Sequence, residues 1–113
     1  MKIMIVDDNR NIREVMKSTV TRRGDEICEC ENARSAIALY KTFQPDWVLM
    51  DVEMEGTDGI TATREMLRVD SKARVIIVTQ YDEVHFRIAA EDAGAVAFVS
   101  KENLHELNRI IHA

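Results

Sequence analysis

Charged and hydroxyl side chains stand at the ends of four short apolar runs of this chain. Two carboxylates follow the run at residues 3–6, one follows 47–50, a hydroxyl follows 75–78, and an ammonium follows 96–99 after one serine. These side chains are Asp7, Asp8, Asp51, Thr79 and Lys101. A polar residue at the end of any one apolar run is ordinary. Four runs that deliver three carboxylates, a hydroxyl and an ammonium make a chemically coherent set.

Three carboxylates brought into one hollow would repel one another, and some would take up protons unless a cation offset their charge. Oxygen ligands with open water positions favour Mg²⁺. The ion and Lys101 would then bracket a phosphoryl group, and Thr79 would donate a hydrogen bond to one of its oxygens. A central carboxylate would be the nucleophile and form an aspartyl phosphate. The set therefore predicts Mg²⁺-dependent phosphoryl transfer.

The segments that must position these side chains alternate between two hydrophobic periods. Continuous or alternating apolar runs predict strands at residues 3–6, 26–31, 47–50, 75–78 and 96–99. Helical spacing predicts five helices between and after these strands. The first is capped by Asn9, stops at Gly24 and has its apolar positions at residues 12, 15, 16, 19 and 20. The second covers 33–43, with 36, 37, 39, 40 and 43 apolar, and the third turns 60, 63, 66 and 67 inward. The fourth covers 82–93, and the last carries 104, 107 and 111.

Strands that alternate with helices predict an α/β fold, in which a doubly wound parallel sheet is covered by helices on both faces. All strands of such a sheet point the same way, so their carboxyl ends share one edge. Ligands bind at that edge, where the strand order reverses. We therefore expect the polar side chains that follow the strands to meet there.

The composition is that of one globular domain spanning residues 1–113. Hydrophobic residues make up 46% and charged residues 31%, and the net charge of −5 argues against direct nucleic-acid binding. No secretory signal is visible, and the longest uncharged stretch of about eight residues is too short to cross a membrane. Cys28 and Cys30 form no disulfide framework. We expect a soluble cytoplasmic domain.

The residues at these strand ends resemble the receiver domain of two-component response regulators. The matching motifs keep their order along essentially the whole chain, at residues 3–9, 48–54, 58–59, 78–79 and 98–101. The resemblance implies a flavodoxin-like five-stranded sheet of order 2-1-3-4-5 with five helices.

By position, the resemblance implies that Asp51 is the phosphoacceptor. It further implies that Asp7 and Asp8 form the acidic pair that binds Mg²⁺ together with Asp51, and that the main-chain carbonyl of Glu53 is a further metal ligand. Thr79 and Lys101 match the hydroxyl and lysine that contact the phosphoryl group. The aromatic switch position, which turns inward when the hydroxyl moves toward the phosphate, is occupied by Phe98.

Three positions depart from the pattern of the family. Glu55 and Glu102 stand where the family often has proline, and Gln80 stands where a small residue is usual. Since a cis bond before a residue other than proline costs about 3 kcal/mol, we expect a trans peptide bond between Lys101 and Glu102. Gln80 and the following Tyr81 are candidate modulators of the phosphoryl site.

The resemblance implies a signalling protein rather than an enzyme, although one that promotes its own phosphorylation and slow autodephosphorylation. It would accept a phosphoryl group from the phosphohistidine of a histidine kinase or phosphotransfer protein. The change in its surface would then control a downstream protein or an output domain. Homodimers of receivers use the fourth and fifth helices or the first and fifth. The sequence ends at Ala113, which suits either a stand-alone receiver or part of a longer, DNA-binding regulator.

Two other functions fit parts of the pattern. A Mg²⁺-dependent phosphohydrolase with an aspartate nucleophile would carry Asp-x-Asp after an early strand, whereas residues 7–9 read Asp-Asp-Asn, and a cap domain is missing. A flavin-binding flavodoxin would need a hydroxyl- and glycine-rich phosphate loop there. Two carboxylates at this position would repel the flavin phosphate, so we reject the flavodoxin and keep the phosphohydrolase as the alternative.

Overall fold

The computed structural model describes residues 1–54, 58–80 and 84–113. Its five strands form one parallel sheet of order β2-β1-β3-β4-β5, which confirms the predicted topology. The strands are β1 (Lys2–Val6), β2 (Glu26–Cys30), β3 (Trp47–Met50), β4 (Val75–Thr79) and β5 (Ala97–Ser100).

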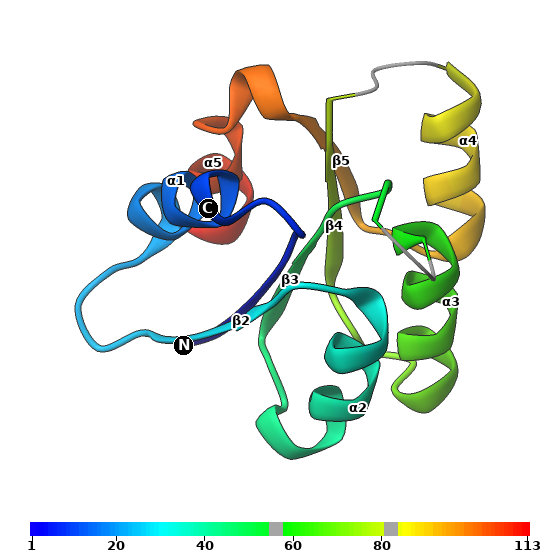
Figure 1. Ribbon diagram of the computed structural model, residues 1–113, viewed down its shortest axis with the longest axis horizontal. Coiled ribbons are helices and arrows are strands. Elements are labelled where there is room, and N and C mark those ends of the chain that lie inside the picture. The colour runs from blue at the N-terminus through cyan, green and yellow to red at the C-terminus, as the bar shows by residue number, and fades with distance from the viewer. Residues whose placement is uncertain (55–57, 81–83) are drawn as a thin grey trace.

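Helices cover both faces of this sheet (Figure 1). The described helices are α1 (Arg10–Val20), α2 (Ala33–Phe43), α3 (Gly59–Val69), α4 (Val84–Ala93), the 3₁₀ helix η1 (Lys101–Asn103) and α5 (Glu106–Ile111). In Figure 1, α1 and α5 lie together on one face, and α2, α3 and α4 lie on the other. None of the helices among the described residues is long and apolar enough to span a bilayer.

The central strands are apolar on both faces because each face packs against helices. Along β1, Ile3 and Ile5 join the core beneath α1 and α5, whereas Met4 and Val6 join the core beneath α2, α3 and α4. Each fully buried side chain of this size contributes about 1.5–3 kcal/mol. The sheet is therefore a rigid base for whatever its carboxyl edge carries.

Polar side chains fix where three of the helices begin. Asn9 Oδ1 accepts a hydrogen bond from the Ile12 amide at 3.1 Å, and Asn32 Oδ1 accepts one from the Ser35 amide at 2.8 Å. Asp58 caps α3 in the same way. Such caps satisfy amides that lack helical partners, and two of them, Asn9 and Asp58, set α1 and α3 beside the carboxyl edge of the sheet.

Two apolar positions of the helical pattern are exposed. Val15 of α1 is 47% exposed and Leu39 of α2 is 42% exposed, because each lies at the margin of its helix's apolar face. An inward position of α1 is instead occupied by Arg13, which is 7% exposed. Gly24 also does not end α1, since the helix stops at Val20; the glycine adopts a φ of +91° in the turn before β2.

Other boundaries shift by small amounts. The predicted last helix is divided, because η1 precedes α5, and only α5 presents the fully buried Leu107 and the buried Ile111. The described part of the fourth helix begins at Val84, and the predicted start at Asp82 lies outside the described residues. The Lys101–Glu102 peptide bond is trans, as expected.

Candidate functional site

The register of the sheet brings residues remote in sequence to one edge. Val6 of β1 pairs with Met50 of β3, and the Asp51 amide donates to the Val6 carbonyl at 2.9 Å. Asp7 and Asp51 therefore leave the sheet side by side. On the other side of β3, Thr79 of β4 pairs with Ser100 of β5, so Lys101 begins just beyond the same edge.

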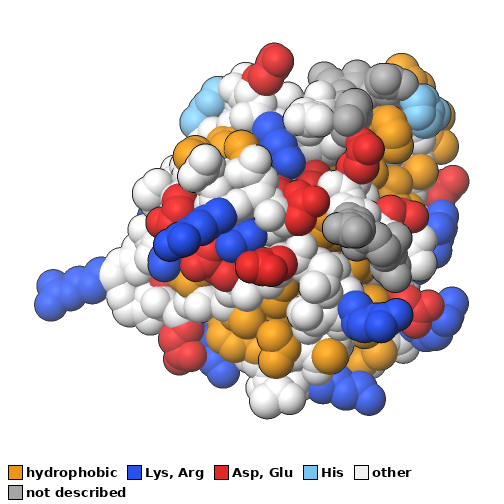
Figure 2. Space-filling model, in the orientation of Figure 1, with side chains coloured by type: hydrophobic (Ala, Val, Ile, Leu, Met, Phe, Trp, Pro, Cys, Tyr) orange, Lys and Arg blue, Asp and Glu red, His pale blue; other side chains and the backbone are white. Residues whose placement is uncertain are grey.

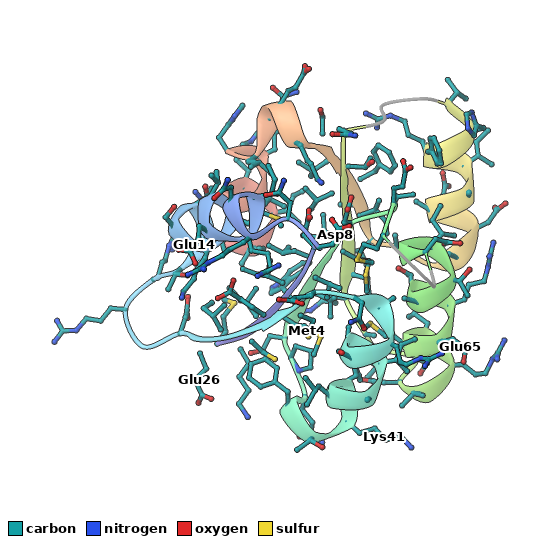
Figure 3. All side chains as sticks on the ribbon, viewed as in Figure 1. Met4, Asp8, Glu14, Glu26, Lys41 and Glu65 are labelled. Atoms are coloured by element: carbon teal, nitrogen blue, oxygen red, sulfur yellow. The ribbon has the colours of Figure 1, made fainter. Side chains whose placement is uncertain are left out.

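Three carboxylates converge at this edge. One oxygen from each of Asp7, Asp8 and Asp51 lies within 4.8 Å of the other two. Asp7 is fully buried, Asp51 is 4% exposed, and Asp8 faces solvent. Figure 3 shows Asp8 just past the end of β1, beside the start of α1, and Figure 2 shows acidic side chains gathered near the middle of the same view.

The carboxylates border an open hollow of about 520 Å³. Its lining includes Asp8, Asp51 and Lys101 together with Glu53 and Gln80. The hollow is thus polar, reachable from solvent, and large enough for a phosphoryl group with its ligands.

Lys101 forms ion pairs with two of the carboxylates. Its Nζ lies 2.8 Å from Asp7 Oδ2 and 3.2 Å from Asp51 Oδ1, and its side chain is 13% exposed. Burial opposes the charged ammonium, but the neighbouring carboxylates of Asp7 and Asp51 outweigh this effect and raise the pKa of Lys101. The lysine therefore stays protonated beside the hollow.

Asp51 lies in an environment that disfavours its charged form. Burial, together with the negative charges of Asp7 and Asp8, raises the pKa of Asp51 to about 6, although the nearby Lys101 opposes the shift. The carboxylate is held close to other negative charges with a single lysine to offset them. This is the charge excess that a bound cation relieves.

The donor set fits a hard divalent cation. All three side chains supply carboxylate oxygens, which suits Mg²⁺. Asp7 Oδ2 is buried, and within the described part of the chain its polar contact is the ion pair with Lys101 Nζ at 2.8 Å, which lacks hydrogen-bond geometry. A carboxylate oxygen in this state can still coordinate a cation.

The remaining predicted residues beside the hollow lie at its rim. Glu53 and Gln80 are both exposed, and each lines the hollow. The proposed modulator Tyr81 lies outside the described residues, as does the departure at Glu55.

Thr79 and Phe98 lie farther inside. Thr79 is fully buried at the end of β4. Phe98 on β5 is half-buried against the core beneath α2, α3 and α4, and the Arg87 guanidinium of α4 lies 4.6 Å from the centre of its ring. The structure thus places the hydroxyl position and the aromatic position on adjacent strands, with the Arg87 guanidinium over the Phe98 ring.

One residue that contacts this site was missing from the predicted set. Arg13 Nη1 donates a hydrogen bond to the main-chain carbonyl of Asp7 at 2.7 Å, and Arg13 Nε donates to Glu29 Oε1 at 3.1 Å. The sequence contained a signal, because position 13 lies on the same helical face as the buried Met16 and Val20. An arginine on the inward face of a helix indicates a buried polar partner.

Replacing Asp51 by asparagine should stabilise the fold in chelator at neutral and alkaline pH. Because the pKa of Asp51 is about 6 in the folded protein and 3.8 ordinarily, the folded state binds the proton more tightly. Wild-type stability should therefore fall as the pH rises from about 4 to about 6, by about 2–3 kcal/mol. Asp51→Asn removes this loss. The difference in unfolding free energy between the variant and the wild type, measured in urea, should therefore grow from about pH 4 to about pH 6 and then stay constant. Asp92→Asn, an exposed change on α4, is the control, and an Asp51→Asn advantage independent of pH contradicts the prediction.

Known proteins are similar to this chain in both sequence and structure. A family model described as the response regulator receiver domain matches residues 3–112. The regulatory protein AtoC of Escherichia coli is 38% identical over 111 residues, which are 97% of this chain and 24% of AtoC. The chemotaxis protein CheY of Bacillus subtilis is 35% identical over 113 residues, which are 99% of this chain and 92% of CheY. The chain therefore spans about a quarter of one relative and nearly all of another.

Solved structures agree. A two-component response regulator of the LuxR family from Aurantimonas sp. SI85-9A1 superposes with a TM-score of 0.91 at 36% identity, over 98% of this chain and 81% of that one. The receiver domain of the histidine kinase CKI1 from Arabidopsis thaliana, complexed with Mg²⁺, superposes with a TM-score of 0.85 at 25% identity, over 98% of this chain and 89% of that one. The chain belongs to the response regulator receiver domain family of two-component systems, as a CheY-like signalling domain rather than a classical enzyme.

Proposed function

We propose that residues 1–113 form a single receiver domain in which Asp51 accepts a phosphoryl group from the phosphohistidine of a histidine kinase or phosphotransfer protein. The observation that carries this proposal is the position of Asp51 between two other carboxylates and Lys101, whose Nζ is 3.2 Å from Asp51 Oδ1. A nucleophilic carboxylate beside a cationic donor and a polar hollow is the arrangement that phosphoryl transfer requires.

In the proposed reaction an oxygen of Asp51 attacks phosphorus as the bond from phosphorus to the histidine nitrogen breaks. The electron pair of that bond stays on the nitrogen. With a pKa of about 6, Asp51 is mostly ionised at neutral pH and ready to attack. Lys101 donates to an oxygen of the transferred group and offsets its charge, and the Thr79 hydroxyl donates to another.

Asp7, Asp8, Asp51 and the main-chain carbonyl of Glu53 would hold Mg²⁺. When bound, the ion offsets the negative charge on the phosphoryl oxygens. The buried Asp7 keeps its Oδ1 on the Asn9 amide at 2.8 Å, which leaves Oδ2 directed toward the site. The exposed Asp8 completes the ligand set from the solvent side.

The output of the proposed reaction is a change of surface. Thr79 moving toward the phosphoryl group would vacate space that Phe98 enters, and Gln80 and Tyr81 would tune access to the site. The altered surface would control a downstream protein, an output domain or a second copy of the chain, in the cytoplasm and without direct contact to nucleic acid. In Borrelia burgdorferi, a CheY of this fold forms a complex with CheX, BeF₃ and Mg²⁺.

Incubation with Mg²⁺ and acetyl phosphate should add one phosphoryl group, as measured by intact mass. Asp51→Asn should abolish the addition, because it removes the attacking carboxylate, and Asp7, the other carboxylate paired with Lys101, is fully buried. Chelator should abolish it as well. Asp92→Asn, which makes the same chemical change on the exposed face of α4, should be labelled like the wild type. Phosphorylation that persists in Asp51→Asn would overturn the proposal.

A further inference from the structure

The main-chain carbonyl of Asp7 lies where β1 leaves the sheet. The ladder between β1 and β2 ends at the pair Val6 and Cys30, and the Asp7 amide still donates to the Cys30 carbonyl at 3.1 Å. Asp7 is fully buried, so its own carbonyl cannot turn to water. Its partner is Arg13 Nη1 at 2.7 Å.

Arg13 is itself held in place. Its Nε donates to Glu29 Oε1 at 3.1 Å, and Lys17 Nζ lies 3.6 Å from the other carboxylate oxygen of Glu29. The Arg13 amide also donates to the Asn9 carbonyl at 3.1 Å within the first turn of α1. The guanidinium thus joins the end of β1 to the edge strand β2 from a fixed place on α1.

We propose that Arg13 is a positioning residue for the divalent cation, an inference that rests on the proposed function. A peptide unit is planar, so the direction of the Asp7 carbonyl also sets the direction of the bond that leads to the Asp8 Cα atom. By fixing this carbonyl, Arg13 fixes the Asp7–Asp8 peptide and aims the Asp8 carboxylate at the hollow. Asp8 is exposed, so packing constrains its side chain less than that of the buried Asp7.

Arg13 binds the main chain of Asp7 rather than its carboxylate, and this difference affects how the cation can bind. Lys101 contacts the carboxylate oxygens of Asp7 and Asp51 directly, so it competes for atoms that the cation needs. Arg13 hydrogen-bonds Asp7 through its main-chain carbonyl and leaves the carboxylate oxygens of Asp7 to the cation. Arginine is suited to this task because its rigid planar fork can satisfy the carbonyl and Glu29 together, whereas the compact ammonium of lysine lacks such a fork.

Isothermal titration with Mg²⁺ tests this inference on the full chain. We expect Arg13→Gln to raise the Kd for Mg²⁺ by about 10–100-fold, the usual effect of removing a group that orients a metal ligand. Arg13→Lys should recover part of the affinity, and Glu29→Gln should weaken binding less than Arg13→Gln. Arg23→Gln, which removes one positive charge from the exposed turn after α1, should bind like the wild type.

Unfolding in chelator and phosphorylation of the wild type separate the possible explanations. A purely structural role for Arg13 would lower stability while the folded variants kept the wild-type Kd, and that result overturns the inference. If Arg13→Gln does not fold, wild-type Kd values in both Arg13→Lys and Glu29→Gln overturn it. If the wild type binds Mg²⁺ and is phosphorylated but the variants bind Mg²⁺ equally well, only the inferred role of Arg13 is overturned. If the wild type binds no Mg²⁺, the proposed function is overturned as well.

Discussion

Replacing Gly59 by alanine is expected to destabilise the domain by about 3 kcal/mol, the upper part of the range for overpacked sites, and to suppress phosphorylation of Asp51. Gly59 opens α3, and a Cβ atom built there would lie 1.8 Å from the main-chain oxygen of Asp51 and 2.9 Å from Met50 Cγ. The closest neighbour is backbone, so no side-chain rotation relieves the clash. Either α3 or the segment after β3 must move, and the second movement displaces Asp51, the proposed phosphoacceptor.

The matched control is the same substitution at Gly24. A Cβ atom at Gly24 meets nothing within 4 Å, but the backbone has a φ of +91°, which costs alanine about 1–2 kcal/mol. Urea unfolding of both variants, together with mass measurement after acetyl phosphate treatment, distinguishes the two causes. Gly24→Ala should retain normal labelling. If Gly59→Ala loses no more stability than Gly24→Ala and is labelled normally, the close approach of α3 to Asp51 is not required.

The convergence of the site could be predicted because it depends on strand direction alone. Asp7, Asp51 and Lys101 each follow a predicted strand, and a parallel sheet sends all three to one edge. Small errors in the strand boundaries, such as the inclusion of Ser100 in β5, leave this result unchanged. The sequence does not predict which carboxylate is buried and which is exposed, because this depends on how α1 and α3 pack around the edge.

The sequence pattern does not identify the partners that a side chain meets on other elements. Arg13 was overlooked because an arginine normally marks the solvent face of a helix, and here its partners come from β1 and β2. The need for glycine at Gly59 arises from a close approach to Asp51 that no local signal reveals. Val15 follows the apolar spacing of α1 and is nevertheless exposed, because periodicity locates the centre of an apolar face better than its margins.

Replacing Lys101 by methionine is expected to destabilise the metal-free domain by about 3 kcal/mol, because removing one partner of a buried ion pair leaves the other charge uncompensated. Lys101 is paired with both Asp7 and Asp51, which stay buried in the variant. Lys41→Met, an exposed change on α2 that Figure 3 labels, removes the same charge and should have little effect.

Two further measurements identify the cause of the loss. The double variant Lys101→Met with Asp51→Asn should recover much of the stability in chelator, because it removes one of the carboxylates that the lysine had offset. Mg²⁺ should raise the melting temperature of Lys101→Met by more than that of the wild type, since the cation then binds an acidic cluster with no competing ammonium. Equal melting temperatures for Lys101→Met and Lys41→Met in chelator would show that the carboxylates do not depend on the lysine. In that case Lys101 would not offset the charges of Asp7 and Asp51, and this electrostatic account of the site would fail.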